Sequence, residues 1–299
     1  MDFIGNRKRA FAISGVLILA GLVSLLIPGR GLNLGIDFTG GWKYHVRFEQ
    51  PATVADVRTA LTPLGLGQSI IQGAGDLGAP AGRDFVIRTG PLDEAAQAAA
   101  KGALAKAFGL TETLSDDPIS PSFGRELTLL AVLGVVVASI LMVAYITWRF
   151  EFKFAITGII ALIHDVFITL GLFSLLRLEI TQAFVAATLT IVGYSINDTI
   201  VVYDRIRDNM RHRKKEPLAA LVNRSIRQSL TRTLNTSGTT LAAILAILVF
   251  GGPTTRPFAV ALLVGVFAGT YSSIFIASPL WVMWKEHEER MRRRRPRLA

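Results

Sequence analysis

The sequence predicts an α-helical polytopic membrane protein with six transmembrane helices and one α+β domain between the first and second of them. Two observations lead to this prediction. Of the 299 residues, 51% are apolar, and they gather in runs of about twenty, the length that a helix needs to cross the hydrocarbon of a bilayer. One long polar stretch, residues 31–126, separates the first run from the others and alternates strand-like with helix-like patterns.

The first apolar run, residues 10–28, follows a basic stretch, as the core of a signal peptide does. However, the run is long for such a core, and the IPGR sequence at its end lacks the small residues of a cleavage site. We therefore expect residues 1–30 to form an N-terminal tail and a retained first transmembrane helix. The other candidate spans are residues 127–147, 154–176, 183–203, about 234–252 and 257–284.

Lysine and arginine predict the orientation of the chain, because cytosolic loops carry them in excess. Residues 204–233 hold nine Lys or Arg against three acids, and residues 285–299 hold seven against three. The short loops on the other side hold one each, Arg177 and Arg256. We therefore expect both termini in the cytosol, residues 204–233 as a basic cytosolic loop of a five-helix region (127–284), and residues 285–299 as a basic cytosolic tail.

This placement also accounts for the net charge of +10. A strongly basic chain can bind nucleic acid, but here the excess lies where topology and anionic lipid require it. We therefore predict contact with membrane lipid and no nucleic-acid partner. The chain has no cysteine, which excludes disulfide scaffolds, thiol catalysis and cysteine-based metal sites.

Residues 31–126 form the predicted extracytoplasmic domain. Alternating apolar residues predict strands, and Thr53 and Asp93 are suited to begin two helices. The resulting order, strand–helix–strand–strand–helix–strand, is typical of a ferredoxin-like α+β module. The predicted elements are strands at residues 42–48, 69–72, 85–88 and 111–114 and helices at residues 54–64 and 93–108.

One apolar span contains a carboxylate. Asn197 and Asp198 lie inside the run 183–203, where placing an ionised Asp in lipid costs about 2.5–3.5 kcal/mol. Such a residue faces protein or water, and a functional role is the default hypothesis. The alternative is a structural Asp that hydrogen-bonds near the helix end.

Three further polar features favour a functional role for Asp198. Tyr194 and Ser195 form a polar cluster with it, and a second acid, Asp165, lies beside His164 in the third span. The fifth span begins with a polar stretch that contains Arg232. Burial raises the pKa of a carboxyl group and a nearby guanidinium lowers it, so movement of Arg232 toward or away from Asp198 would release or bind a proton. We expect protons as the coupling ion and no other cofactor.

At these residues the chain resembles the SecD/SecF family of protein-export membrane proteins, within the resistance-nodulation-division superfamily, and in particular its smaller SecF-type members. The matching segments occur in the family's order along nearly the whole chain, and the region 50–120 matches least. They are GLNLGIDFTGG (31–41), SFGREL (122–127), RFEFKFA (149–155), IALIHDVFIT (160–169), GYSINDTIVVYDRIRDN (193–209) and SLTRTLNTSGTTL (229–241).

The resemblance implies a function. Members of this family, SecD and SecF together, use the proton motive force to promote late stages of protein translocation through SecYEG. It implies SecD, SecYEG, a YajC-type accessory subunit and the translocating preprotein as partners, and the bacterial cytoplasmic (inner) membrane as the location. The family's proton path falls here on Asp198 and Arg232. Asp165 is a further candidate for that path or a structural support, and Asn197 a supporting residue.

Two other segments each allow two interpretations. Gly40 and Gly41, after the first span, would serve as a hinge for the outer domain or as a rigid turn. Residues 217–234 have apolar residues at helical spacing, which predicts an amphipathic helix that lies on the inner leaflet or acts as a rod coupled to Arg232.

Three other functions compete with proton-driven export. A subunit of a proton-coupled lipid or drug exporter of the same superfamily would need a partner chain, because such exporters usually have two six-span halves. An intramembrane aspartyl protease would need a G-x-G-D-like segment, whereas Ser195-Ile196-Asn197 precedes Asp198. A passive scaffold would use the buried acids only to join helices. We expect a transport subunit and not an enzyme.

Overall fold

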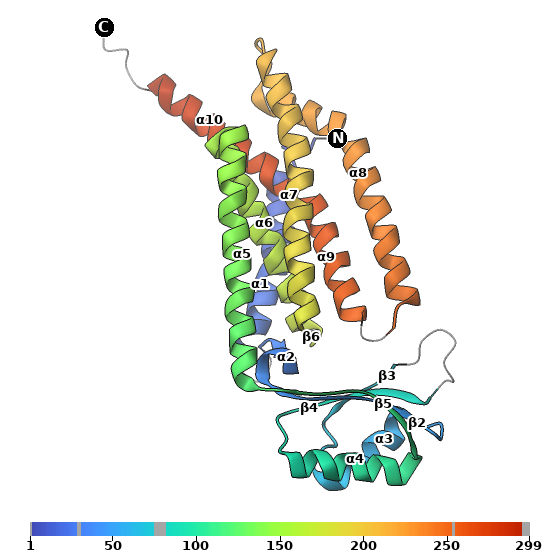
Figure 1. The fold of residues 1–299 in the computed structure, drawn as a ribbon. Coiled ribbons are helices and arrows are strands. Elements are labelled where there is room, and N and C mark those ends of the chain that lie inside the picture. Colours follow the sequence, from blue (N-terminus) through green and yellow to red (C-terminus); the bar gives the residue numbers. More distant parts are fainter. Residues whose placement is uncertain (1, 29–30, 75–81, 253–254, 295–299) are drawn as a thin grey trace.

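The computed structural model describes residues 2–28, 31–74, 82–252 and 255–294. Long helices form a bundle, and a small α+β module lies at one end of it (Figure 1). Six helices are long and apolar enough to cross a membrane, as the sequence predicts. The bundle helices are α1 (Arg7–Leu26), α5 (Pro121–Arg149), α6 (Phe152–Leu175), α7 (Gln182–Arg211), α8 (Leu218–Phe250), α9 (Arg256–Ser272) and α10 (Ser278–Arg294).

The last span is one continuous helical stretch with an irregular centre. A π-helical turn, Ser273–Ala277, joins α9 to α10. Beyond this turn, Trp281 stacks on Phe154 of α6, with ring centroids 4.7 Å apart, and Lys285 pairs with Glu151 at 2.8 Å. Much of the predicted cytosolic tail is therefore helical and packed, while its residues 295–299 lie outside the described part of the chain.

The amphipathic segment before the fifth span differs from the leaflet interpretation, while a rod coupled to Arg232 stays a prediction. It is the first part of α8, a single helix of 33 residues, and its apolar stripe is buried in protein rather than in a leaflet. Leu221 and Val222 pack in one core with Trp281 and with Phe3 from the N-terminal segment. That segment is fixed by Asn223, whose Oδ1 accepts hydrogen bonds from the Phe3 and Ile4 amides at 2.8 and 3.1 Å.

Helices α1 and α6 approach each other through small residues. A Cβ added at Gly21 would lie 2.6 Å from the Cα of Gly171, so this crossing has no space for a larger side chain. One turn further along both helices, the hydroxyls of Ser24 and Ser174 lie 2.8 Å apart. Close backbone approach at small residues, with hydroxyls that bond across the interface, is typical of helices that associate in membranes.

The outer module is a four-stranded antiparallel sheet in the order β3-β4-β2-β5, with two helices on one face (Figure 1). Helix α3 begins at a capping box of Thr53 and Asp56, as expected for a threonine at that position. Strand β5 is longer than predicted. The elements are β2 (Gly41–Phe48), α3 (Val54–Leu61), the short turn η1 (Thr62–Leu64), β3 (Ile70–Gly73), β4 (Asp84–Thr89), α4 (Glu94–Phe108) and β5 (Leu110–Ile119).

The module has its own core. Trp42, Tyr44 and Phe48 alternate along β2 and are fully buried, which is the predicted pattern for a strand with one face covered by helices. Trp42 also donates a hydrogen bond from Nε1 to Oδ1 of Asp116 at 2.7 Å. The predicted turn between the second and third strands falls largely on residues 75–81, outside the described part of the chain.

The segment between α1 and the sheet belongs to the base of the bundle. Strand β1 (Asn33–Leu34) pairs in parallel with β6 (Glu179–Ile180), which connects α6 to α7, and the short helix α2 (Ile36–Thr39) follows. The sheet thus begins at Gly41, whereas the sequence places the domain boundary at residue 31.

Gly40 and Gly41 form the turn into the sheet. Their φ angles are 77° and 157°, and a Cβ would lie 2.8 Å from the nitrogen of Pro121 at the first position and 2.2 Å from the Thr89 carbonyl oxygen at the second. Only glycine fits both the conformation and the space. This packing favours the rigid turn, and a hinge here stays a prediction.

Two side chains fasten this junction to the bundle. Asp37 of α2 accepts a hydrogen bond from the Gln182 amide at 2.8 Å and so caps the first turn of α7, whose own cap residue provides no such bond. Arg88 of β4 donates from Nη1 to Oε2 of Glu179 at 2.9 Å. Burial raises the pKa of Glu179, and the Arg88 guanidinium opposes that rise.

Candidate proton-relay site

Asp198 lies in the interior of the bundle, with 2% of its surface exposed. Its Oδ2 accepts hydrogen bonds from Ser237 Oγ of α8 at 3.0 Å and from Thr270 Oγ1 of α9 at 3.3 Å. The two hydroxyls also lie 2.7 Å from each other. The carboxyl group of Asp198 on α7 is therefore in contact with two neighbouring helices through short, neutral side chains.

The two oxygens of Asp198 differ. Both of these hydrogen bonds go to Oδ2, and within the described part of the chain no hydrogen bond is made to Oδ1. A carboxylate has acceptor capacity on both oxygens, and a protonated carboxyl donates from one of them. Oδ1 is thus the atom that is available to take up a proton without displacing an existing donor.

Asp165 is buried more completely and has more partners. Oδ1 lies 2.8 Å from His164 Nδ1, and Oδ2 accepts from Ser195 Oγ of α7 at 2.6 Å and Ser272 Oγ of α9 at 2.8 Å. On its other side, His164 Nε2 lies 2.9 Å from Ser14 Oγ of α1. This chain of hydrogen bonds connects four helices, so the arrangement supports a structural role for Asp165.

The two acids share a tight interface between α7 and α9. Ser195, which bonds Asp165, is three residues before Asp198 on α7. A Cβ added at Gly269 of α9 would lie 2.9 Å from the Ser195 Cβ, and one at Gly265 would lie 2.2 Å from Ile191 Cδ1. Glycine at these positions lets α9 bring its hydroxyls up to both carboxylates.

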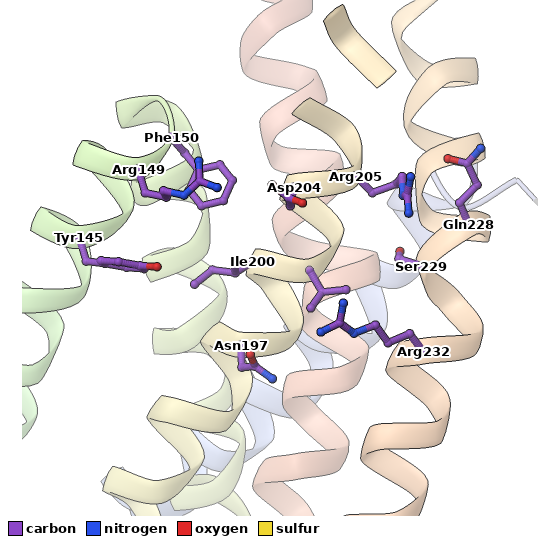
Figure 2. Close-up of a pocket in the computed structure, with 11 residues that line it drawn as sticks. Tyr145, Arg149, Phe150, Asn197, Ile200, Asp204, Arg205, Gln228, Ser229 and Arg232 are labelled. Carbon is purple, nitrogen blue, oxygen red and sulfur yellow. The ribbon is translucent and has the colours of Figure 1, made fainter. Parts of the chain in front are cut away.

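Arg232 does not contact Asp198. Within the described residues no hydrogen bond or ion pair joins them, and the α8 residue that bonds Asp198 is Ser237, which lies further along the helix. Arg232 instead extends from α8 toward α7 (Figure 2) and lines a pocket of about 330 Å³ together with Asn197. Asn197 and Asp198 are consecutive, so α7 turns one side chain toward this pocket and the next into the bundle.

The sequence interpretation missed three residues of the site: Ser14, Thr270 and Ser272. Each is a hydroxyl residue within an apolar span, a signal that is weak because such hydroxyls commonly bond a carbonyl of their own helix. Thr270 does so as well, with Oγ1 2.9 Å from the Val266 carbonyl oxygen. Among the described residues, no group of three or more His, Cys, Asp or Glu side chains could hold a metal ion.

Comparison with protein families gives two matches. The model described as "Protein export membrane protein SecD/SecF, C-terminal" matches residues 100–287. The model described as "SecD/SecF GG Motif" matches residues 25–52, the stretch that contains Gly40 and Gly41.

Named relatives match most of the chain. Protein translocase subunit SecF of Magnetococcus marinus is 46% identical over 93% of this chain and 90% of its own length. SecF of Acidaminococcus fermentans is 44% identical over 97% of this chain and 99% of its own. SecDF of Thermus thermophilus is 41% identical over 96% of this chain, which corresponds to 39% of that longer protein.

Solved structures agree with these relatives. A crystal structure of SecDF from Thermus thermophilus, described as a translocon-associated membrane protein, has a TM-score of 0.82 at 39% identity and covers 96% of this chain and 39% of that one. SecDF in a super-membrane-facing form has a TM-score of 0.72 over 98% and 40% of the two chains. From these matches over nearly its full length, the chain belongs to the SecD/SecF family of protein-export membrane proteins.

Proposed function

We propose that the chain is the SecF-type subunit of a SecD–SecF complex in the bacterial cytoplasmic membrane, where it uses the proton motive force to promote late stages of translocation through SecYEG. In this proposal it is a non-enzymatic, multi-pass transport subunit. Both termini are cytosolic, and the outer module is extracytoplasmic and ferredoxin-like. The fused SecDF relatives support a SecD partner. A YajC-type subunit and the preprotein complete the proposed set of partners.

One observation carries the mechanism: the Asp198 carboxylate lies in the bundle with hydroxyls of two other helices on one oxygen and none on the other. Protonation at Oδ1 would remove the charge and weaken the hydrogen bonds that Oδ2 accepts from Ser237 and Thr270, because hydrogen bonds to an ionised acceptor are stronger than those to a neutral one. The contacts of α7 with α8 and α9 thus depend on the proton. A proton that crosses the membrane potential gains about 2.3 kcal/mol per 100 mV, which is available to drive such a rearrangement.

Arg232 and Asn197 would act on the other side of α7. With the guanidinium in the pocket, Asp198 has no cation beside it in the described structure, a state suited to a protonated acid. Movement of α8 along α7 that brings Arg232 closer would favour the ionised acid and proton release. Arg232 and Ser237 lie five residues apart on α8, so exchange of the hydroxyl for the guanidinium would require α8 to slide by about 7.5 Å and to rotate, or the Arg232 side chain to swing round the helix.

Replacement of Asp198 tests this function. Asp198→Asn keeps the shape of the side chain and one acceptor oxygen but cannot bind and release a proton. We expect preprotein translocation into energised vesicles to lose the increase that the proton gradient provides, while translocation without a gradient is unchanged.

The matched control is Asp208→Asn, an exposed acid on the same helix, which should leave the gradient-dependent increase intact. Equal amounts of the SecD–SecF complex must be present in all vesicles. If Asp198→Asn retains the full increase, Asp198 is structural and the proposed mechanism is wrong.

A further inference from the structure

Glu179 lies where the outer module meets the bundle. It belongs to β6, the connection between α6 and α7, and β6 and α2 lie between the long helices and the sheet (Figure 1). Its side chain is largely buried, and its Oε2 accepts the hydrogen bond from Nη1 of Arg88 on β4. A carboxyl group of the bundle is thus buried at the contact with the module.

The two oxygens of Glu179 have different surroundings. Oε2 has the Arg88 guanidinium, whereas Oε1 is buried and has no hydrogen-bond partner among the described residues. A Cβ added at Gly35 would lie 2.7 Å from Oε1 and 3.0 Å from the Ile180 carbonyl oxygen, so these two oxygens border the same small space. An ionised carboxylate only accepts hydrogen bonds, while a protonated one donates from one oxygen. A proton on Oε1 would therefore turn an unsatisfied acceptor into a donor beside a carbonyl oxygen.

The charges around Glu179 act in opposite directions. Burial raises its pKa, the Arg88 guanidinium lowers it, and the carboxylate of Asp37 on α2 raises it further. The neighbouring residues of β1 and the first turn of α7 are uncharged, and Arg177, two residues earlier on the same connection, is exposed. Because burial outweighs the single cation, the pKa of Glu179 lies above its ordinary value of 4.5.

The docked junction and a separated one would differ in their affinity for this proton. In the docked junction Glu179 is buried and its pKa is raised, whereas separation of the module would expose the side chain to water and return the pKa toward 4.5. The state with the higher pKa binds the proton more tightly, so acid favours docking. As the pH rises through the docked-state pKa, the proton is lost and docking weakens.

The junction is not closely packed. A hollow of about 250 Å³ lies between Ile36 of α2 and the module, where Ser69, Arg88 and Thr89 line it. Separation of the module therefore breaks fewer van der Waals contacts here than it would in a filled interface.

We propose that Glu179 is a proton-binding residue in addition to Asp198, and that a proton on its Oε1 holds the outer module on the bundle. The proton would come from the extracytoplasmic side, which is the acidic side of an energised membrane. The proposal rests on the proposed function only for this orientation, since proton binding at Glu179 does not require Asp198. Loss of the proton would free the module to move.

The test measures the distance between the module and the bundle in the full chain, and the absence of cysteine allows two specific spin labels. Thr59→Cys on α3 and Leu176→Cys after α6 provide exposed sites, and double electron–electron resonance in nanodiscs gives the distance distribution. We expect a narrow distribution at pH 5 and a broader one that extends to longer distances at pH 8. Glu179→Gln keeps a donor and an acceptor but cannot lose a proton, so it should give the narrow distribution at both pH values.

Two further variants check the cause. Arg88→Gln should broaden the distribution at pH 8 more than in the wild type and leave it narrow at pH 5, because the ionised Glu179 would have lost its cation. Glu112→Gln, an exposed acid of the module, is the matched control and should respond to pH as the wild type does.

Opposite results would overturn the proposal. The proton site is wrong if the wild type does not respond to pH or broadens as the pH falls, if Glu179→Gln keeps the wild-type response, or if Glu179→Gln is broad at both pH values. Asp198→Asn in the labelled chain should leave the response unchanged, which separates this site from the proton relay. Loss of the response in Asp198→Asn would assign it to the relay and contradict a separate role for Glu179.

Discussion

At the scale of single residues, each buried carboxylate of this chain is matched to its surroundings in a different way. Asp165 has donors on both oxygens and Asp198 on one. Asp84, in the outer module, has a bidentate cation: Arg47 donates from Nε to Oδ1 at 2.7 Å and from Nη2 to Oδ2 at 3.0 Å. In the proposed function, the acid of these three that exchanges a proton is the one with an oxygen that accepts no hydrogen bond among the described residues, Asp198.

Asp84 gives a prediction about pH. The hydrogen bonds from Arg47 hold the pKa of Asp84 below its ordinary value of 3.8. Because the pKa is lower in the folded state, the ionised Asp84 adds to the free energy of unfolding. This contribution is fully present above the unfolded-state pKa and is lost as the pH falls through the folded-state pKa. We expect Asp84→Asn to destabilise the outer module by about 1–3 kcal/mol at pH 6, the usual cost of a lost hydrogen bond to a charged group.

The measurement is the unfolding midpoint of the full chain in detergent at pH 6 and at pH 3. The difference between wild type and Asp84→Asn should be large at pH 6 and should shrink at pH 3. Glu94→Gln, at an exposed position in the first turn of α4, should show no such difference. A gap between wild type and Asp84→Asn that is the same at both pH values would contradict the role given to the ionised pair.

At the scale of helices, α6, α7 and α9 are held together by hydroxyls that converge on Asp165. Ser195 and Ser272 donate to the same carboxylate oxygen, and Gly269 permits the close approach of α9. In a bilayer, water does not compete for these groups, and packing and interhelical hydrogen bonds drive helix association.

Removal of these hydroxyls should weaken the bundle. We expect Ser195→Ala combined with Ser272→Ala to lower the thermal unfolding midpoint, by an amount that corresponds to about 1–3 kcal/mol for a buried acceptor left without its donors. Ser139→Ala on α5 is the control, since among the described residues that hydroxyl bonds only the Val135 carbonyl of its own helix. Equal midpoints for the double variant and the control would show that Asp165 does not join the helices.

How far the sequence predicts this structure also depends on the element. The six spans can be predicted from the sequence, because a run of about twenty apolar residues is the length that a helix needs to cross a bilayer. The burial of Asp198 inside the bundle can also be predicted, because a carboxylate within such a run must face protein or water. The environment of the first part of α8 cannot be predicted, because its apolar stripe, which includes Leu221 and Val222, would suit a lipid leaflet as well as a protein core. The β1–β6 pair is also unpredictable, because it joins two-residue strands from distant parts of the chain.

The hydrogen bonds of the Asp198 site also could not be predicted from the sequence. A hydroxyl in an apolar span can bond its own helix, as the Thr236 hydroxyl bonds the Arg232 carbonyl oxygen at 2.9 Å, or a neighbouring helix, as Ser237 bonds Asp198. Spacing along one helix cannot distinguish the two, because the difference is set by the position of the second helix. The separation of Arg232 from Asp198 is likewise a property of how α8 is placed beside α7.

At the scale of the whole molecule, the outer module is joined to the bundle through a few contacts. The chain passes between them at Gly40–Gly41 and at the start of α5, and the Arg88–Glu179 pair crosses from the sheet to the α6–α7 connection. Both side chains are largely buried, at 13% and 9% exposure. If proton transport moves the module relative to the bundle, this pair has to separate or turn.

Cross-linking tests that movement, and the absence of cysteine from the chain makes introduced thiols specific. Arg88→Cys with Glu179→Cys, joined by a short reducible cross-linker, should abolish the gradient-dependent increase in translocation, and reductant should restore it. The control pair is Lys43→Cys with Asp117→Cys, neighbours across two strands within the module, whose linkage should have no effect. Full activity of the cross-linked Arg88–Glu179 variant would show that the module works without moving at this junction.

The π-helical turn at Ser273–Ala277 has a consequence for how this family can vary. An α-helix turns by about 100° for each residue, and a π-helical turn holds one residue more than an α-helical turn would. Deletion of one residue here would therefore rotate α10 relative to α9 and carry Trp281 away from Phe154 and Lys285 away from Glu151. Substitution of a side chain in the turn changes the contacts of that residue alone. A change in the length of the turn changes the contacts of every residue in α10. We therefore expect deletion of one residue from this segment to destabilise the bundle more than substitution of one of its side chains.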